Sequence, residues 1–161
     1  RRTSSAASDV YKRQVKTPCV GICSTVFGDE VCRGCKRYQH EIIDWNSYDQ
    51  SEKSYVLNRL ESLKVQIMEP KVKVFDAKLL KSKLLEYKVK FDDESNPLCW
   101  VFDLLRTGSQ SIQNTKDFGF NLSDKDISQL ADLKRDMEEE LFELSEAHYD
   151  RYYKVEKYIN V

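Results

Sequence analysis

Four cysteines near the N-terminal end have the spacing of a metal site. Cys19 and Cys23 are separated by three residues, Cys32 and Cys35 by two, and a short loop joins the pairs. Two cysteines at such a spacing can both turn inward from one tight loop, and two pairs supply the four soft ligands that a tetrahedral metal needs. The sequence therefore predicts one metal centre with Cys19, Cys23, Cys32 and Cys35 as its ligands.

Glycines and a proline accompany the cysteines where the backbone must bend. Gly21 lies within the first pair, Gly34 within the second, and Gly28 in the connecting loop. Because positive φ is cheap only for glycine, we expect these residues to form the turns. Pro18 fixes φ at the entry to the first pair and so lowers the entropy lost when Cys19 is positioned.

Two other uses of the thiols compete with metal binding. Disulfides require an oxidising compartment, and the sequence shows neither an export signal nor the loop-rich composition of a secreted cystine scaffold. A thioredoxin-like redox pair at Cys32 and Cys35 would follow a strand and open a helix, and no strand pattern precedes Cys32. Metal binding by all four thiols is the favoured interpretation.

The same segment resembles a known bacterial family. The resemblance rests on the motifs from Thr17 to Cys23 and from Val31 to Arg37, followed by Glu41, Ile42 and Trp45. Over about residues 17–63 it is similar to domain of unknown function 1289, whose members are often labelled as iron–sulfur proteins. The resemblance implies that the four cysteines are metal ligands, and it implies no established reaction.

The identity of the metal is open between Zn²⁺ and a 4Fe–4S cluster. Four thiolates leave a net charge of about −2 around either centre, so charge does not discriminate between them. Arg33, Lys36 and Arg37 lie close enough in the sequence to compensate that charge in both cases. Two tight cysteine turns are typical of a closed structural zinc site, which slightly favours zinc.

The two histidines and the fifth cysteine are not needed as ligands. His40 follows Cys35 closely, but four cysteines already complete the site, so we interpret His40 as a polar surface residue. His148 falls in the last helical pattern and is expected at a packing seam. Cys99 lies beside Trp100 and is interpreted as a small buried residue. The sequence contains no nucleophile–base pair, phosphate loop or dinucleotide fingerprint, which favours a non-enzyme.

The elements that must position the cysteines are predicted to be mostly helical. A capping box Ser47-x-x-Gln50 precedes apolar residues at helical spacing, so we expect a helix over about 48–67, ending before Pro70. Trp45, just before it, is expected in the core. Residues 15–69 are thus predicted to form a four-cysteine metal-binding module with a capping helix.

Residues 70–161 are predicted to form a mainly helical C-terminal region. The fold class is therefore mostly α with a possible short two-stranded β element (α+β). The last pattern resembles a heptad seam, which predicts a helical pair or a homodimer through the terminal helix. Its apolar residues near one stripe are Ile127, Leu130, Met137, Leu141, Leu144, Val155 and Ile159. The expected elements are strands around Val72–Val74 and Tyr87–Phe91, a helix over about 76–86, a helix from Asn96 to Gly108, and a long helix from Ser123 to about Tyr158.

Composition narrows the classes of function. The mean hydropathy of −0.63, with no apolar run near the ~20 residues needed to cross a bilayer, excludes a membrane-spanning protein. A formal charge of −1 gives no general reason to expect nucleic acid as a partner. The lysine-rich residues 71–90 keep nucleic-acid binding as a third hypothesis, although the acidic residues 111–161 offer them an internal partner. Residues 1–14 have no apolar core and no periodicity, so we expect a non-native or disordered stretch.

The sequence as a whole predicts a small, cytoplasmic, metal-binding accessory or interaction protein. Its four-cysteine site is expected to be structural, with a protein as partner and no membrane. The alternative is an iron–sulfur protein that transfers electrons or senses oxidation through the same four thiols.

Overall fold

The computed structural model describes residues 17–123 and 129–154, so the predicted N-terminal stretch 1–14 lies outside it. The chain divides into two compact units, one up to Arg59 and the other from Leu60. The described residues are mostly α-helical with a small two-stranded antiparallel sheet, which confirms the predicted fold class. Among these residues no helix combines the length and the apolar character that spanning a membrane requires.

The first unit begins with irregular chain that carries the four cysteines. The 3-10 helix η1 (Ser24–Phe27) follows the first cysteine pair. Val31 and Tyr38 then form an antiparallel bridge, which closes a hairpin around the second pair. α2 (Gln39–Asp44) and the 3-10 turn η2 (Trp45–Ser47) lead into α3 (Gln50–Met68).

A capping box opens α3, but not at the predicted residues. The backbone N–H of Glu52 donates to Asp49 Oδ1 over 2.8 Å, and the N–H of Asp49 donates to Glu52 Oε2 over 2.9 Å. The Ser47 hydroxyl instead donates to the Asp44 carbonyl oxygen at the end of α2. The predicted box at Ser47 and Gln50 is therefore wrong by two residues, while the predicted helix itself is confirmed.

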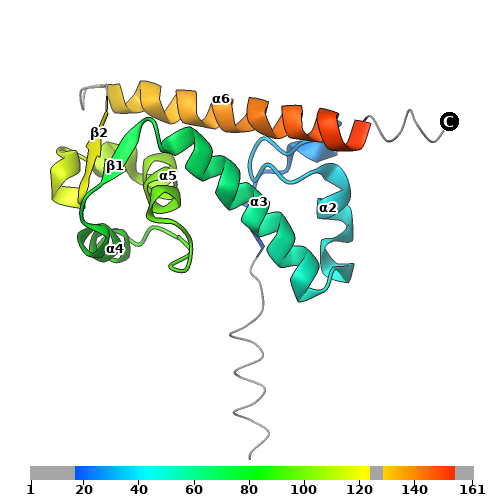
Figure 1. The fold of residues 1–161 in the computed structure, drawn as a ribbon, viewed down its shortest axis with the longest axis horizontal. Coiled ribbons are helices and arrows are strands. Elements are labelled where there is room, and N and C mark those ends of the chain that lie inside the picture. The colour runs from blue at the N-terminus through cyan, green and yellow to red at the C-terminus, as the bar shows by residue number, and fades with distance from the viewer. Residues whose placement is uncertain (1–16, 124–128, 155–161) are drawn as a thin grey trace, which may run out of the picture. The chain divides into compact units, whose positions relative to one another are not determined.

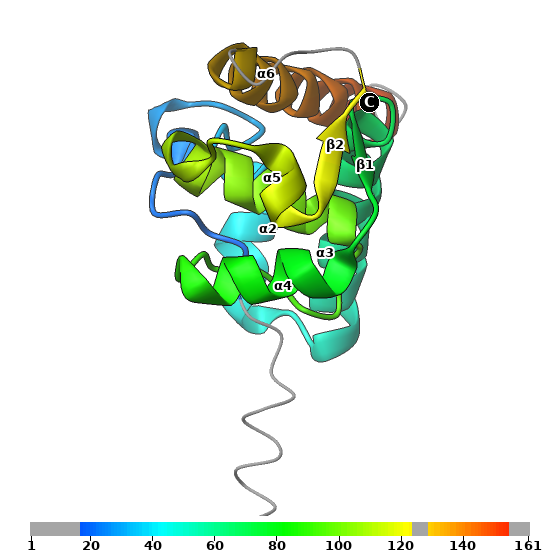
Figure 2. The same cartoon turned by 90° about the vertical axis from the view of Figure 1, so that its left-hand side faces the viewer.

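The second unit combines several helices with a short two-stranded sheet. In Figures 1 and 2, α5 (Pro97–Gly108) lies between α4 (Ala77–Glu86) and α6 (Leu130–Tyr149). The sheet is formed by β1 (Val72–Val74) and β2 (Phe120–Leu122), in the register that pairs Lys73 with Asn121. The helices are α4 (Ala77–Glu86), α5 (Pro97–Gly108), the 3-10 turns η3 (Ser109–Ser111) and η4 (Thr115–Phe118), α6 (Leu130–Tyr149) and the π-helical turn η6 (Asp150–Lys154).

Local capping explains why two of these helices were predicted closely. The Asp76 side chain accepts the N–H of Leu79 at the start of α4. The Asn96 side chain accepts the N–H of Leu98, and Pro97 occupies the first helical position of α5. Each signal lies within a few residues of the helix that it starts, so the sequence alone contains it.

The strand predicted at Tyr87–Phe91 is wrong. Lys88 adopts a positive φ of 54°, and the N–H of Val89 donates to the Leu84 carbonyl oxygen, so this segment ends α4 in a Schellman-type cap. Val89 and Phe91 pack partly buried against the core from a loop, which accounts for their apolar character. The partner of β1 is β2, which lies far along the chain.

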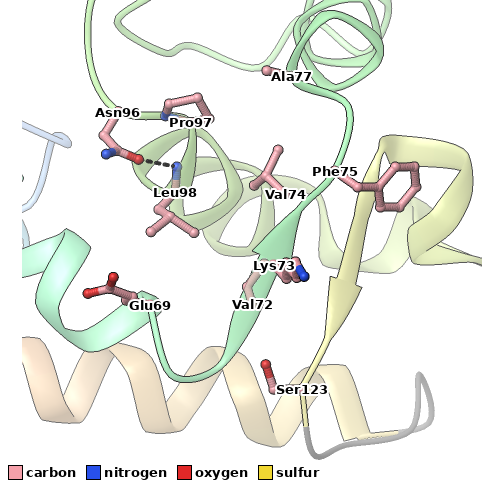
Figure 3. Close-up of a pocket in the computed structure, with 10 residues that line it drawn as sticks. All are labelled: Glu69, Val72, Lys73, Val74, Phe75, Ala77, Asn96, Pro97, Leu98 and Ser123. Carbon is pink, nitrogen blue, oxygen red and sulfur yellow. Dashed lines mark hydrogen bonds between the residues drawn. The ribbon is translucent and has the colours of Figure 1, made fainter.

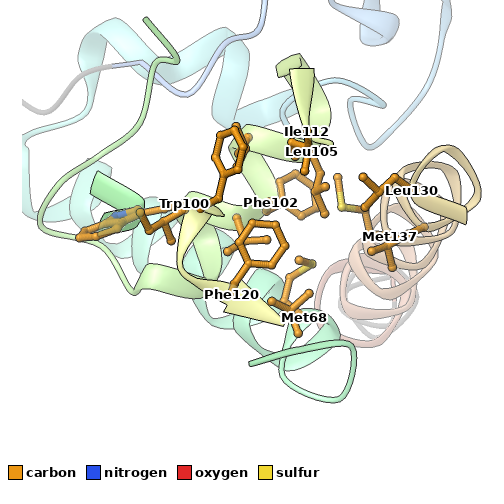
Figure 4. Packing of buried hydrophobic residues seen from close by; sticks show 14 of the residues in the cluster. Met68, Trp100, Phe102, Leu105, Ile112, Phe120, Leu130 and Met137 are labelled. Carbon is orange, nitrogen blue, oxygen red and sulfur yellow. The ribbon is translucent and has the colours of Figure 1, made fainter. Parts of the chain in front are cut away.

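The core of the second unit is built around α5. Figure 4 shows Leu105 and Ile112 facing Leu130 and Met137 of α6. The buried side chains of α6 are three or four residues apart, which confirms the apolar stripe predicted for this helix. Predicted stripe residues Ile127, Val155 and Ile159 lie outside the described residues, and the homodimer stays a prediction. The buried cluster comprises Leu63, Ile67, Met68, Val72, Leu80, Leu84, Trp100, Val101, Phe102, Leu104, Leu105, Ile112, Phe118, Phe120, Leu130, Leu133, Met137 and Leu141.

The basic and acidic segments of this unit contact each other. Lys71 Nζ donates to Glu140 Oε2 of α6 over 2.6 Å, and it also donates to the Ile67 carbonyl oxygen. Lys81 and Lys83 form further ion pairs, with Asp93 and Glu86. Of these three pairs, that of Lys71 joins the basic segment to the acidic residues 111–161, as the sequence analysis predicts, whereas Lys81 and Lys83 pair with carboxylates close to them in the sequence.

Candidate metal centre

The second cysteine pair is held in a tight hairpin turn. The N–H of Lys36 donates to the Cys32 carbonyl oxygen over 2.8 Å, and the N–H of Cys32 donates to the Arg37 carbonyl oxygen over 2.9 Å. Cys32 is 1% exposed and Cys35 8% exposed, so both thiols face the interior of the first unit. The turn thereby holds Cys32 and Cys35, which are separated by two residues, in the arrangement that a pair of metal ligands would need.

The pKa of the Cys32 thiol is lowered by its surroundings. Burial by itself acts to raise the pKa of the Cys32 thiol. Backbone hydrogen bonds from Cys35, Ser24 and Gly34 outweigh burial, with a smaller contribution from the Cys35 side chain, and lower the pKa to about 7. The turn is therefore arranged to stabilise negative charge on this sulfur.

The sulfur of Cys35 has a cationic neighbour. Arg37 Nε donates to Cys35 Sγ over 3.3 Å, and the guanidinium lies over the ring of Trp45. Burial raises the pKa of the Cys35 thiol, and the hydrogen bond and charge of Arg37 oppose that rise. The predicted core position of Trp45 is confirmed, since this residue is buried.

The first cysteine pair is more open. The N–H of Gly21 approaches Cys19 Sγ at 3.4 Å, and Gly21 adopts the positive φ of 94° that was expected of it. The thiol of Cys23 lies 2.9 Å from the hydroxyl oxygen of Thr25. Cys19 is exposed and Cys23 is half-buried, in contrast to the second pair.

Gly34 brings the two cysteine segments together. A Cβ built at this residue would lie 2.7 Å from the Ile22 carbonyl oxygen and 2.7 Å from Val20 Cγ2. The Cys32 thiol lies 3.5 Å from the same carbonyl oxygen of Ile22. Only a glycine therefore lets the chain between Cys19 and Cys23 reach the second turn.

This role differs from the predicted one. The left-handed residue of the second turn is Lys36, with φ of 63°, and Gly34 is not among the residues with positive φ. Lys36 is buried, and its Nζ donates to the carbonyl oxygens of Arg33 and Gly34 over 2.6 and 3.2 Å. The lysine side chain thus satisfies the carbonyl groups of the turn that its own backbone closes.

A buried ion pair that no local sequence signal predicts supports the second cysteine turn. Arg59 of α3 donates from both terminal nitrogens to the two carboxylate oxygens of Glu41, each over 2.7 Å. Glu41 also accepts the N–H of Tyr38 over 2.8 Å, and the guanidinium of Arg59 lies 4.0 Å from the centre of the Tyr38 ring. Glu41 accepts the Tyr38 N–H within the first turn of α2, a local contact at the start of that helix. The link from Glu41 to Arg59 is visible only in the fold.

The structure gathers part of the predicted ligand set. Cys32 and Cys35 are both buried within one tight turn. In residues 17–123 and 129–154, however, no three His, Cys, Asp or Glu side chains are grouped so that they could hold one metal ion. The four-cysteine centre stays a prediction, with one pair assembled and the other pair beside it.

This segment has a counterpart among known protein families. Residues 17–64 match the family described as protein of unknown function (DUF1289). The match confirms the resemblance found in the sequence, and it covers the four cysteines but under a third of the chain. No curated protein and no solved structure matches the chain at a significant level.

Other residues singled out in the DUF1289 segment take peripheral positions. Arg33 is largely exposed, and its Nε pairs with the Asp29 carboxylate over 3.3 Å. Pro18 is half-buried at the entry to the segment. His40 is half-buried, with its ring 5.9 Å from that of Tyr38.

The two remaining candidates lie outside the DUF1289 segment. His148 is half-buried near the end of α6, with its ring 5.7 Å from that of Tyr152. Cys99 is buried, and burial raises the pKa of its thiol to about 12, as the interpretation of a small core residue expects.

An open groove of about 570 Å³ lies in the second unit, beside β1. Figure 3 shows β2 on one side of β1, with Glu69, Asn96 and Leu98 on the other. Its lining includes the charged side chains Glu69 and Lys73, while the rest is apolar or neutral. Because these groups do not form a convergent set of nucleophile, acid and base, we place the candidate site in the DUF1289 segment.

Replacing Gly34 by alanine is expected to separate the two cysteine turns. The added methyl group would meet the Ile22 carbonyl oxygen, which is backbone and cannot rotate away, so we expect a loss of about 1–3 kcal/mol in stability of the first unit. Gly28→Ala is the matched control for loss of a loop glycine, because its Cβ would meet no atom within 4 Å although its φ of 101° is strained. Metal affinity measured by competition with a chelator should fall more for Gly34→Ala than for Gly28→Ala. Equal affinities would contradict the steric role of Gly34.

Proposed function

We propose that the DUF1289 segment holds one metal centre through Cys19, Cys23, Cys32 and Cys35. The observation that carries this proposal is the tight turn in which Cys32 and Cys35 are both buried, and in which backbone hydrogen bonds lower the pKa of the Cys32 thiol to about 7. Metals bind the thiolate form of cysteine, and N–H groups directed at sulfur favour that form. The protein would then be a metal-dependent accessory or interaction protein.

The donor set suits the proposed centre. Four thiols are soft ligands of the kind that Zn²⁺ and iron–sulfur clusters take. The chain between Cys19 and Cys23 already lies against Gly34, so the first pair is close to the second turn. When bound, the metal would cross-link the two turns and add its binding free energy to folding.

A structural role for the metal is supported by the size of the unit, and the tight cysteine spacing keeps zinc as the first choice. Up to Arg59, the described residues bury only a small apolar set besides the second cysteine pair: Val31, Tyr38, Trp45 and Val56. Units this small commonly need a metal or disulfides for stability. Four thiols that bind a metal must stay reduced, so we infer a cytoplasmic location.

Exposed apolar side chains support an interaction role. The 3-10 helix η1 buries its polar residues Ser24 and Thr25 and exposes Val26 by 77% and Phe27 by 89%. Ile22, just before it, is 71% exposed. Apolar side chains that gather on a surface commonly mark contacts with another protein, so we infer a protein partner for this unit.

Metal analysis of the whole chain tests the proposed function. Protein purified without oxygen is expected to be colourless and to contain one zinc per chain by elemental analysis. A brown protein with iron and sulfide would assign the alternative, an iron–sulfur centre on the same ligands. Cys99→Ala should retain the metal, because this cysteine lies in the core of the other unit. Protein that holds neither zinc nor iron at equimolar levels would overturn the proposal.

A further inference from the structure

Arg37 is buried against the candidate centre. Its residue is 4% exposed, its Nε donates to Cys35 Sγ over 3.3 Å, and its guanidinium carbon lies 4.7 Å from the centre of the Trp45 ring. Its backbone carbonyl oxygen closes the same turn by accepting the N–H of Cys32. The charge, the donor and the turn are thus fixed together.

A buried guanidinium is costly unless an anion or a polar acceptor compensates it. The other arginines within residues 17–59 have carboxylate partners, since Arg33 pairs with Asp29 and Arg59 with Glu41. In the described part of the chain no carboxylate forms an ion pair with Arg37, whose side chain contacts sulfur and the face of an aromatic ring. The acceptor that this arginine contacts is therefore the sulfur of Cys35, which would carry negative charge when it binds a metal as a thiolate.

We propose that Arg37 is the internal counter-charge of the metal centre, a positioning residue that holds the Cys35 thiolate and offsets the negative charge of a four-thiolate site. This inference rests on the proposed function. In the folded unit the N–H···S bond fixes the direction of the sulfur, and the stack on Trp45 fixes the guanidinium. Partners of this kind commonly change metal affinity by about 10–100-fold when they are removed.

A purely structural role predicts a different outcome. If Arg37 served only to fill space beside Trp45, an unbranched apolar side chain of similar length would replace it without changing metal affinity. Arg37→Met is that replacement, because it keeps the packing on Trp45 and removes both the charge and the donor. Arg37→Lys keeps the charge and loses the planar guanidinium that stacks on the ring.

The experiment is a metal titration of the full chain. Co²⁺ binding is followed by its thiolate charge-transfer absorption, and Zn²⁺ affinity is measured by competition with a chromophoric chelator, for the wild type, Arg37→Met, Arg37→Lys and the control Arg33→Met. Arg33 lies on the same loop with the same charge, but it is exposed and paired with Asp29. We expect about a 10–100-fold weaker affinity for Arg37→Met, an intermediate value for Arg37→Lys, and a change within about 2-fold for Arg33→Met.

The outcomes separate this inference from the proposed function. Wild-type protein that binds neither Co²⁺ nor Zn²⁺ at the thiols would remove the metal centre itself. Wild-type binding with equal affinities for Arg37→Met and Arg33→Met would overturn the role of Arg37 alone. If Arg37→Met is less folded by circular dichroism than the wild type in the same metal state, the comparison of Arg37→Lys with Arg33→Met decides, and an Arg37→Lys affinity equal to that control would likewise overturn the role.

Discussion

Replacing Cys35 by serine is expected to unfold the first unit and to abolish its metal binding. Cys35 is buried, like Cys32, and its sulfur accepts the Nε–H of Arg37 over 3.3 Å. Structural metal sites of this type contribute on the order of 10 kcal/mol to folding, which exceeds the stability that a small apolar core can supply. Cys23→Ser is expected to have the same effect through the other pair. Metal content by elemental analysis and unfolding by circular dichroism measure both consequences.

Cys99→Ser is the matched control for this substitution. It makes the same chemical change in another buried cysteine, whose thiol lies 3.8 Å from the Glu61 carbonyl oxygen in the second unit. We expect it to retain the metal and to lose at most about 1–3 kcal/mol, because serine fits the same space and has an acceptor for its hydroxyl. If Cys35→Ser retained metal and stability as well as Cys99→Ser does, a structural centre at the four cysteines would be excluded.

The second cysteine turn shows how far spacing alone can predict a site. The two-residue separation of Cys32 and Cys35 required a turn that puts both thiols on one side, and the structure has that turn. The conformation within it was not predictable in the same way. The left-handed position is taken by Lys36, whose own side chain binds the carbonyl groups of the turn, so the usual glycine rule pointed to the wrong residue.

Long-range contacts set the limit of prediction in both units. Glu41 and Arg59 are separated by 18 residues, and nothing in their local sequences indicates that they pair. β1 likewise pairs with β2, which lies about half the length of the second unit further along the chain. The nearer apolar residues Val89 and Phe91, whose alternation predicts a strand, pack against the core from a loop instead. Helix starts were predicted well because a cap such as Asp76 acts within one turn. Sheet pairing and buried ion pairs depend on the whole fold, so sequence periodicity does not determine them.

These contacts connect the framework of the first unit to its thiols. Tyr38 ends the hairpin that holds Cys32 and Cys35, and its N–H is bound by Glu41. Arg59 fixes Glu41 from α3 and lies over the Tyr38 ring. A change in this ion pair is therefore transmitted to the second cysteine turn through Tyr38, without any direct contact with sulfur.

Replacing Glu41 by glutamine is accordingly expected to destabilise the first unit by about 3–5 kcal/mol, because it leaves the charge of Arg59 buried without its carboxylate. The Glu41 side chain is 4% exposed and that of Arg59 14% exposed, so solvent compensates little of this loss. Hydrogen exchange of residues 31–47, measured by mass spectrometry on the metal-loaded chain, should become faster. Metal release to a chelator should also become faster, since the turn that holds Cys32 and Cys35 opens more often.

Two further variants separate the ion pair from a general loss of charge. Asp29→Asn also removes a carboxylate that pairs with an arginine, but there the arginine side chain is 67% exposed, so we expect a change within about 1 kcal/mol. Glu41→Gln combined with Arg59→Met should cost less than the two single changes added together, because the double variant leaves no uncompensated charge. Additive losses, or exchange in Glu41→Gln no faster than in Asp29→Asn, would show that the hairpin keeps its turn without this pair. The metal-ligand geometry would then depend on the cysteines and Arg37 alone.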